Sequence, residues 1–257
     1  MSPRRAKATG VGAILIGLAL IATVAGVLWN MHEEVESAMP EPSPNADFQA
    51  YPDGFPIVDW GYWEEVNPAV IGWITIPGTN IDLPIVQGPQ DDPDYYLSHD
   101  VYRNRNANGC PYLDAECSEL GLLSRNSVIF AHHSSNGAMF SELANYSDAS
   151  FAAEHPRILL QTPGWKATLT PRMVSVVNAS KEPKQVVFQD EAEYAEWWAD
   201  KRARATLDLD SEDVPARTYS FVTCSYTTWS NERTVVYAAP MESIFGFREV
   251  PIAVTGS

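Results

Sequence analysis

Short apolar segments bounded by turn residues recur along this chain from about residue 57 onward. The first two, Val70–Ile76 and Ile81–Val86, flank the sequence Pro-Gly-Thr-Asn at 77–80, a turn signal that predicts a β-hairpin. Six later segments are also predicted to be strands: Ser127–Ala131, Arg157–Gln161, Trp165–Thr170, Met173–Ala179, Thr218–Cys224 and Thr234–Ala239. The spacing of these strands favours a mostly β domain with the character of a barrel.

One segment departs from this pattern and is predicted to be a helix, from about Asp190 to Ala205. Asp190 and Glu193 form a relative of the capping box, and the residues that follow recur at helical spacing. Trp197 and Trp198 are expected to pack this helix on the barrel.

The charge and cysteine content exclude several classes of protein. The 257 residues carry 17 Lys and Arg against 33 Asp and Glu, a formal net charge of −16, so phosphate-rich partners are repelled and nucleic-acid binding is not expected. The acidic run 208–213 is interpreted as a solvated loop; a Ca²⁺ loop is the alternative, but the EF-hand spacing is missing. Three cysteines are too few for a disulfide-built scaffold and lack the spacing of a structural zinc site.

The first 30 residues form a region of their own. Three cations precede the uncharged segment 10–29, whose 20 residues would span about 30 Å as a helix, the thickness of a bilayer core. The positive-inside rule then predicts a single-pass anchor with its N-terminus in the cytoplasm. A cleaved signal peptide is the alternative, but the apolar run is longer than usual. The predicted regions are a cytoplasmic tip and anchor at 1–30, a Pro-rich stalk at 31–56 and an extracellular domain at 57–257.

The three cysteines fall into two groups. Cys110 and Cys117 are near enough in sequence for the chain between them to turn back and close a small disulfide. Cys224 remains alone at the end of a predicted strand. An odd thiol in an exported protein is either a buried inert residue or a reactive group.

The neighbours of Cys224 bear on that choice. If the last two predicted strands form an antiparallel hairpin, Cys224 and Arg233 face each other across it. The guanidinium would favour the thiolate and could hold a developing oxyanion with its fork of donors. The alternative is that Arg233 merely pairs with Glu232 or another surface acid.

Acyl transfer by a thiol also needs a proton donor for the leaving amine. His132 and His133 follow an apolar strand, and adjacent residues point to opposite sides, so only one of them can face a given partner. A zinc site made of both histidines and Cys224 is a further interpretation. Neighbouring histidines are poorly placed to chelate together, however, and no H-E-x-x-H motif is present.

Residues from about 60 to 240 resemble the sortases, and within them class B. The segments that carry the resemblance occur in order and at sensible spacing: Asn67–Gln87, Tyr95–Leu97, Val128–His132, Met139–Leu143, Phe151, Ile158–Pro163, Thr223–Tyr226 and Arg233–Val236. The predicted helix near 190–205 is similar to the extra helix that marks class B.

The resemblance implies a closed β-barrel with peripheral helices, and a membrane-anchored cysteine transpeptidase that needs no cofactor or metal. It makes Cys224 the nucleophile, His132 the proton donor, and Arg233 the group that positions the substrate and stabilises the oxyanion. His132 stands directly after the strand, where the family usually has Gly-His-Asn. This chain has Ala131 and His133 in that motif, so His133 stays a contender.

The resemblance also implies partners. These are exported proteins or pilins with a C-terminal sorting signal, and an amine acceptor on a peptidoglycan precursor or on a pilin. Leu97, Thr223 and Ser225 are candidates for lining the substrate groove, whereas a disulfide between Cys110 and Cys117 is not a feature of class B in general.

Two other functions remain open. A papain-like cysteine peptidase would place its Cys before its His, the reverse of the order here. A non-catalytic, membrane-tethered β-domain that binds cell-wall components would bury Cys224 as an inert thiol. The sorting motif, the acceptor amine and the choice between wall anchoring and pilus assembly do not follow from the sequence.

Overall fold

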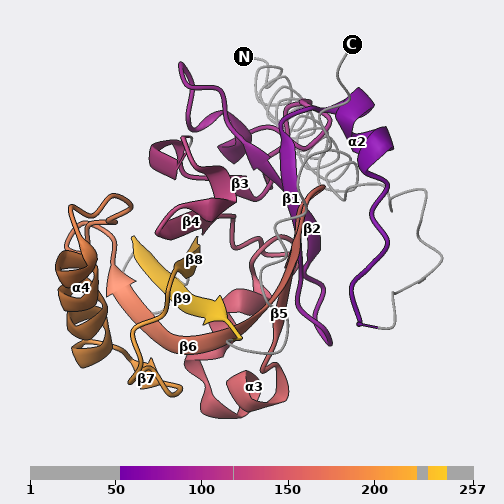
Figure 1. Ribbon diagram of the computed structural model, residues 1–257. Coiled ribbons are helices and arrows are strands. Elements are labelled where there is room, and N and C mark those ends of the chain that lie inside the picture. The colour runs from indigo at the N-terminus through magenta and orange to yellow at the C-terminus, as the bar shows by residue number, and fades with distance from the viewer. Residues whose placement is uncertain (1–52, 118, 225–230, 242–257) are drawn as a thin grey trace, which may run out of the picture. The chain divides into compact units, whose positions relative to one another are not determined.

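The computed structural model describes residues 53–117, 119–224 and 231–241 (Figure 1). The predicted anchor at 10–29, nearly all of the predicted stalk and Ser225 lie outside the described residues. Within the described ranges, no helix combines the length and the apolar character needed to cross a membrane.

The strands of the described residues form one sheet in the order β5-β1-β2-β3-β4-β8-β9-β6-β7, and a further pairing of β5 with β6 closes eight of them into a barrel. Their bounds are β1 Val70–Thr75, β2 Asp82–Gln87, β3 Tyr112–Leu113, β4 Asn126–Phe130, β5 Ile158–Gln161, β6 Lys166–Asn178, β7 Leu207–Asp208, β8 Thr218–Cys224 and β9 Glu232–Pro240. The pairs β2–β3 and β4–β8 are parallel and the others are antiparallel. The prediction of a mostly β closed barrel is confirmed.

The predicted N-terminal hairpin is confirmed as the antiparallel pair β1 and β2. The amide of Ile76 donates to the carbonyl of Ile81 at 2.8 Å and closes the connection between the strands. Gly78 in this turn has a φ of +87°, a conformation that glycine adopts without the steric cost of a side chain.

Two of the predicted strands, 165–170 and 173–179, are a single strand, β6. Pro171 stands between the two predicted segments, and a proline has no N–H to donate to a ladder. The register between β6 and β9 shifts between Pro171 and Met173, so an irregularity in the ladder accommodates the proline. The resulting strand of 13 residues is long enough to pair with both β5 and β9, and this closes the barrel.

The helices lie around the barrel (Figure 1). The α-helices are α2 Trp60–Val66, α3 Ala149–Glu154 and α4 Glu191–Ala203; the 3-10 helices are η1 Tyr95–Leu97, η2 Ala115–Cys117, η3 Gly121–Leu123 and η4 Glu142–Ser147. The predicted helix over 190–205 is thus confirmed as α4. The carboxylate of Asp190 accepts from the amide of Glu193 at 2.9 Å, which satisfies one of the free N–H groups of the first turn.

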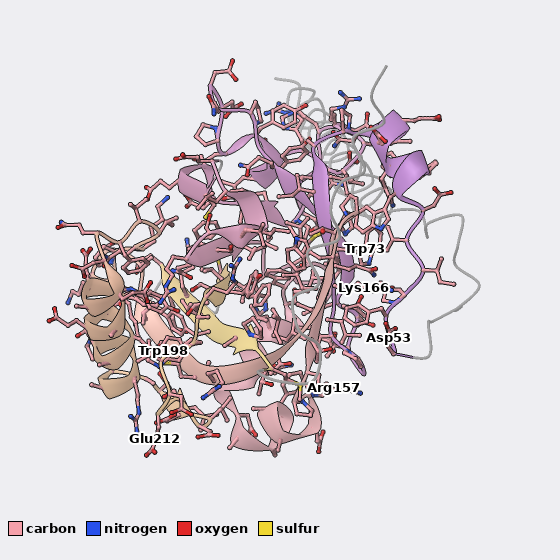
Figure 2. All side chains as sticks on the ribbon, viewed as in Figure 1. Asp53, Trp73, Arg157, Lys166, Trp198 and Glu212 are labelled. Carbon is pink, nitrogen blue, oxygen red and sulfur yellow. The ribbon has the colours of Figure 1, made fainter. Side chains whose placement is uncertain are left out.

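Tryptophans join α4 to the barrel, as predicted. The Trp197 ring meets the ring of Tyr237 on β9 with centroids 6.0 Å apart. Trp198, labelled in Figure 2, is 1% exposed, and its Nε1 donates to the carbonyl of Ser211 at 2.9 Å. The acidic run that follows α4 also makes hydrogen bonds within itself, because Asp208 accepts one from the Ser211 amide at 3.0 Å and one from the Ser211 hydroxyl at 2.7 Å.

The first described residues are attached to the barrel beside β6. Lys166 forms an ion pair with Asp53 at 3.9 Å, both labelled in Figure 2, and its ammonium lies 5.2 Å from the ring centroid of buried Phe55. The side-chain amide of Gln161 on β5 donates to the carbonyl of Pro56 at 3.0 Å. Residues 53–56 are therefore attached to the barrel.

The disulfide predicted between Cys110 and Cys117 is wrong, because both residues are free and buried. Between them the chain forms β3, which inserts between β2 and β4. The Cys110 thiol faces the carbonyl of Pro84 on β2, and the Cys117 thiol faces that of Asn126 on β4. One sulfur thus contacts the strand on one side of β3, and the other sulfur contacts the strand on its other side. This arrangement depends on long-range strand pairing, which the spacing of the two cysteines in the sequence does not reveal.

Candidate active site

Cys224 and Arg233 lie directly opposite each other in the β8–β9 ladder, as the hairpin model predicted. Residues opposite each other in an antiparallel pair have Cα atoms about 4.5–5.5 Å apart, so the guanidinium and the thiol start from neighbouring backbone positions. Cys224 is 8% exposed, and the Arg233 side chain donates to the carbonyl of Glu232 at 3.0 Å.

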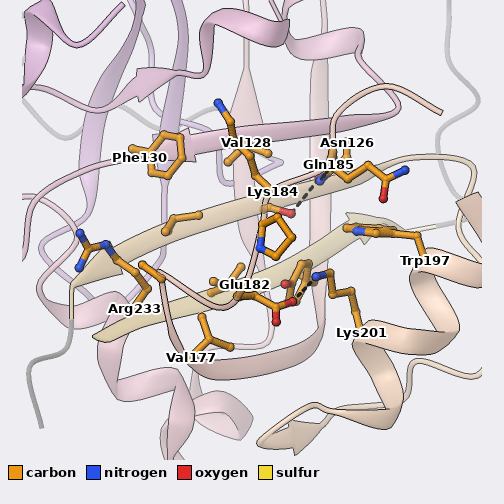
Figure 3. A pocket seen from close by; sticks show the side chains of 16 residues that line it. Asn126, Val128, Phe130, Val177, Glu182, Lys184, Gln185, Trp197, Lys201 and Arg233 are labelled. Atoms are coloured by element: carbon orange, nitrogen blue, oxygen red, sulfur yellow. Dashed lines mark hydrogen bonds and ion pairs between the residues drawn. The ribbon is translucent and has the colours of Figure 1, made fainter. Parts of the chain in front are cut away.

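A cavity of about 340 Å³ extends along the side of the sheet on which Arg233 lies (Figure 3). Its floor is made by alternate residues of three neighbouring strands: Asn126, Val128 and Phe130 of β4, Ser220 and Val222 of β8, and Arg233, Val235 and Tyr237 of β9. Because side chains alternate along a strand, Cys224 belongs to the same side as Ser220 and Val222. The thiol and the guanidinium therefore share the face of the sheet that carries the cavity.

The opposite wall of this cavity comes from α4 and from the segment 179–185 that precedes it (Figure 3). Glu182 and Lys201 form an ion pair in this wall, and their side chains are 13% and 7% exposed. Lys184 forms a second ion pair with the buried carboxylate of Asp114. These pairs tie the wall to α4 on one side and to the end of β3 on the other.

His132 belongs to the same face. It follows Val128 and Phe130 by steps of two, and the ladder to β8 continues one residue past β4 because the Ala131 amide donates to the Val222 carbonyl at 3.2 Å. The Nε2 of His132 lies 2.8 Å from the carbonyl oxygen of Leu97. A carbonyl only accepts, so this contact assigns a proton to Nε2 and leaves Nδ1 for other partners.

His133 lies on the other side of the sheet. It lines a separate cavity of about 530 Å³ together with Glu232, Thr234 and residues of η4 and α3. Its Nδ1 lies 2.8 Å from the backbone carbonyl oxygen of Cys224. Of the two adjacent histidines, His132 is therefore the one that shares a face with the thiol and with Arg233.

Tyr112 is a neighbour of this cluster that the sequence analysis did not single out. Its ring stacks on Phe130 with centroids 5.6 Å apart. Burial and nearby carboxylates raise the pKa of its hydroxyl, the charge of Arg233 opposes that increase, and Cys224 adds to it. The phenol thus lies within electrostatic range of both groups, and the position of β3 beside β4 brings it there.

Comparison with known proteins identifies the family of this chain and the members that it resembles. A family model described as a sortase domain matches residues 74–241. The chain belongs to the sortase family. Sortase B of Listeria monocytogenes serovar 1/2a (strain ATCC BAA-679 / EGD-e) is 36% identical over 93 residues, which are 36% of this chain and only 37% of that relative. Sortase B of Staphylococcus aureus (strain NCTC 8325 / PS 47) is 23% identical over 177 residues, or 68% of this chain and 71% of that one.

Solved structures agree with this assignment. The X-ray structure of Clostridium perfringens sortase B has 26% sequence identity and a TM-score of 0.64, covering 71% of this sortase and 99% of that chain. The resemblance to class B sortases is therefore confirmed, and with it membership of a family of cysteine transpeptidases.

The remaining predicted groove residues of this sortase have different positions. Leu97 is half-buried and offers its carbonyl to His132. Thr223 is 1% exposed and points to the side opposite Cys224, so the prediction that it lines the substrate groove is wrong. Alternation along β8 was sufficient to exclude it. Among the residues that the structure describes, no group of three or more His, Cys, Asp or Glu is placed to hold a metal ion.

Proposed function

We propose that this sortase cleaves a C-terminal sorting signal of exported proteins and transfers the new acyl end to an amine of the cell wall or of a pilin. Cys224 is the nucleophile, His132 moves the proton, and Arg233 holds the carbonyl oxygen. The observation that carries the proposal is the arrangement of these three residues on one face of the sheet, where Arg233 lines the 340 Å³ cavity.

The reaction proceeds in two halves. The Cys224 thiolate attacks the scissile carbonyl, and the Arg233 guanidinium binds the oxyanion that forms. The carbon–nitrogen bond then breaks, His132 gives a proton to the leaving amine, and a thioester remains on Cys224. The acceptor amine attacks the thioester, returns a proton to His132 and leaves with the acyl group. Because the Leu97 carbonyl occupies Nε2, the proton is exchanged at Nδ1 of His132.

The cavity beside Arg233 fits an extended peptide. It lies along strands whose residues advance by about 3.3 Å each, so the distance from Arg233 to Tyr237 on β9 corresponds to about 13 Å, or four extended residues. Valine side chains and Phe130 offer apolar contacts along this path, and Arg233 stands at one end of it.

We further propose that the segment 10–29 anchors the enzyme in the cell membrane, with the N-terminus in the cytoplasm and the barrel outside the cell. What supports this is the apolar character of that segment and the three cations before it. An enzyme held at the outer membrane surface meets exported precursors and wall amines where both are delivered.

The test is cleavage of a library of pentapeptide sorting signals by the full chain, with mass spectrometry of the acyl-enzyme. We expect an adduct on Cys224 and none in Cys224→Ala. Arg233→Lys should lower kcat/KM by about 10²–10³-fold, because the ammonium cannot reproduce the guanidinium fork. Arg157→Lys, a change at an exposed arginine labelled in Figure 2, is the matched control and should leave activity unchanged. Full transpeptidation by Cys224→Ala would refute the proposal.

A further inference from the structure

The carbonyl group of Cys224 has an unusual hydrogen-bond partner. The parallel ladder of β4 and β8 ends with the pair Phe130 and Val222 and the bond from the Ala131 amide to the Val222 carbonyl. In a parallel ladder, the amides of one strand that donate to the other are two residues apart. If the ladder continued, the amide of His133 would therefore be the next to donate, and its acceptor would be the carbonyl of Cys224.

The backbone does not continue in that direction. The His132 carbonyl accepts from the Phe140 amide at 3.0 Å, and His133 forms a bridge with Met139, so the chain folds back on itself after β4. In place of the backbone amide, the Nδ1 of His133 lies 2.8 Å from the oxygen of Cys224. The imidazole therefore supplies the donor that the ladder would have supplied.

This bond fixes the tautomer of His133. The carbonyl oxygen of Cys224 can only accept, so Nδ1 carries the proton. The imidazolium would also carry a proton there, so the bond persists in either protonation state. Its function is therefore separate from the proton transfer assigned to His132, which lies on the opposite face of the sheet.

We propose that His133 is a positioning residue that holds the backbone of the nucleophile from the face opposite the substrate. The proposal rests on the proposed function of Cys224. On one edge, the end of β8 is held by the ladder to Arg233. On the other edge β4 has already ended, and His133 provides the support there. Two adjacent histidines thus serve the thiol from two sides, His132 with its proton and His133 with its hydrogen bond.

Loss of the hydrogen bond from His133 should lower the rate of acyl transfer, because that rate depends strongly on the geometry of the reacting groups. A misplacement of about 1 Å between reacting groups lowers a rate by about 10²-fold. Freeing the Cys224 carbonyl lets the peptide group rotate and changes the direction of the Cα–Cβ bond, and hence the position of Sγ relative to Arg233. The cavity that receives the peptide is on the other face and has no contribution from His133.

The experiment compares three substitutions of His133 in the full chain. Asparagine places its amide NH₂ near the position of Nδ1, glutamine places it near Nε2, and alanine removes the donor. We expect His133→Ala and His133→Gln to lower kcat about 10–100-fold with KM changed less than about threefold. His133→Asn should recover kcat to within about threefold of the original. The pH values at which its activity rises and falls should be the same as in the original.

His155→Ala is the matched control, because His155 also bonds a backbone carbonyl through Nδ1, that of Phe151 at 2.9 Å, but far along the chain from Cys224. It should leave kcat unchanged. Equal rates for His133→Asn and His133→Gln would overturn the proposal, and this comparison still decides it if His133→Ala does not fold. Normal activity of His133→Ala, with Cys224→Ala and His132→Ala inactive, would refute the positioning role alone. Full activity of Cys224→Ala would instead refute the proposed function.

Discussion

The three thiols of this sortase differ in their surroundings. Burial raises the pKa of Cys110, and the charge of Asp100 adds to the effect. Burial also raises the pKa of Cys117. Cys224 is also buried, at 8% exposed, but it lies opposite Arg233 on the face of the sheet that carries the cavity. Since the thiolate is the reactive form, the first two cysteines are protected at neutral pH by both burial and protonation.

We therefore expect a methanethiosulfonate reagent to modify one cysteine rapidly in the native protein at pH 7.5 and all three after unfolding in guanidinium chloride. Peptide mapping should place the rapid modification on Cys224, and Cys224→Ala should lack it. Labelling of Cys110 at a rate similar to that of Cys224 would show that the region around β3 is open in solution.

At the residue scale, local patterns predicted part of the site. The pairing of Cys224 with Arg233 was predictable because a hairpin joins two strands that are neighbours in sequence. The choice between His132 and His133 needed the observed faces of the sheet, since either could have followed the strand inward. The wrong disulfide prediction and the unpredicted stacking of Tyr112 on Phe130 both depend on β3. The two residues of β3 give no periodic signal, and its place between β2 and β4 is set by long-range pairing.

At the scale of elements, the acidic run 208–213 that follows α4 contributes to stability through the hydrogen bonds of Asp208. The Ser211 hydroxyl lowers the pKa of Asp208, desolvation opposes this, and Arg202 lowers it further. A carboxyl group whose pKa is lower in the folded state stabilises the fold above its unfolded value of about 3.9. That contribution is lost as the pH falls through the lowered folded value.

Asp208→Asn should accordingly reduce the melting temperature at pH 7 by about 2 °C, a small effect because the Asp208 side chain is 43% exposed. The variant should also lose less stability than the original chain between pH 5 and pH 2. Melting curves across this range check the prediction, with the exposed Asp213→Asn as control. If both variants follow the same acid profile, the hydrogen bonds around Asp208 do not contribute.

The elements themselves were predictable to different degrees. The helix α4 was predicted because its cap and its apolar spacing are both local. β6 was wrongly predicted as two strands. The register of the ladder to β9 shifts between Pro171 and Met173, and this irregularity lets one strand continue past the proline. The 3-10 helices were not predicted, since segments of three to six residues carry too little periodicity to detect.

At the scale of the whole molecule, barrel closure brings together residues that are distant in sequence. The parallel pairing of β4 with β8 places His133 against Cys224, 91 positions away. The number and spacing of the strands predicted a barrel, but the order of the strands did not follow from them. The partners of each strand are set by packing in the interior, which no single segment encodes.

The proposed membrane anchor at 10–29 can be tested by following the full chain in cells. In a host with an intact export pathway, the full chain should stay with the membranes after carbonate extraction, whereas a chain beginning at residue 31 behind a cleavable signal should be released. External protease should reach the barrel in intact cells stripped of their wall. A mature N-terminus found after residue 20 by mass spectrometry would show instead that the segment is a cleaved signal.

The ladder between Cys224 and Arg233 has a consequence for how such an enzyme can be altered. The position of the two residues is set by the register of their strands, which five further pairs of residues share, from Tyr219 and Ala238 up to Thr223 and Thr234. Shifting one strand by a single position would turn the thiol or the guanidinium to the opposite face of the sheet, away from the cavity. An engineer who wants other peptides to be accepted should therefore vary the side chains that line the cavity and leave the pairing of β8 with β9 intact.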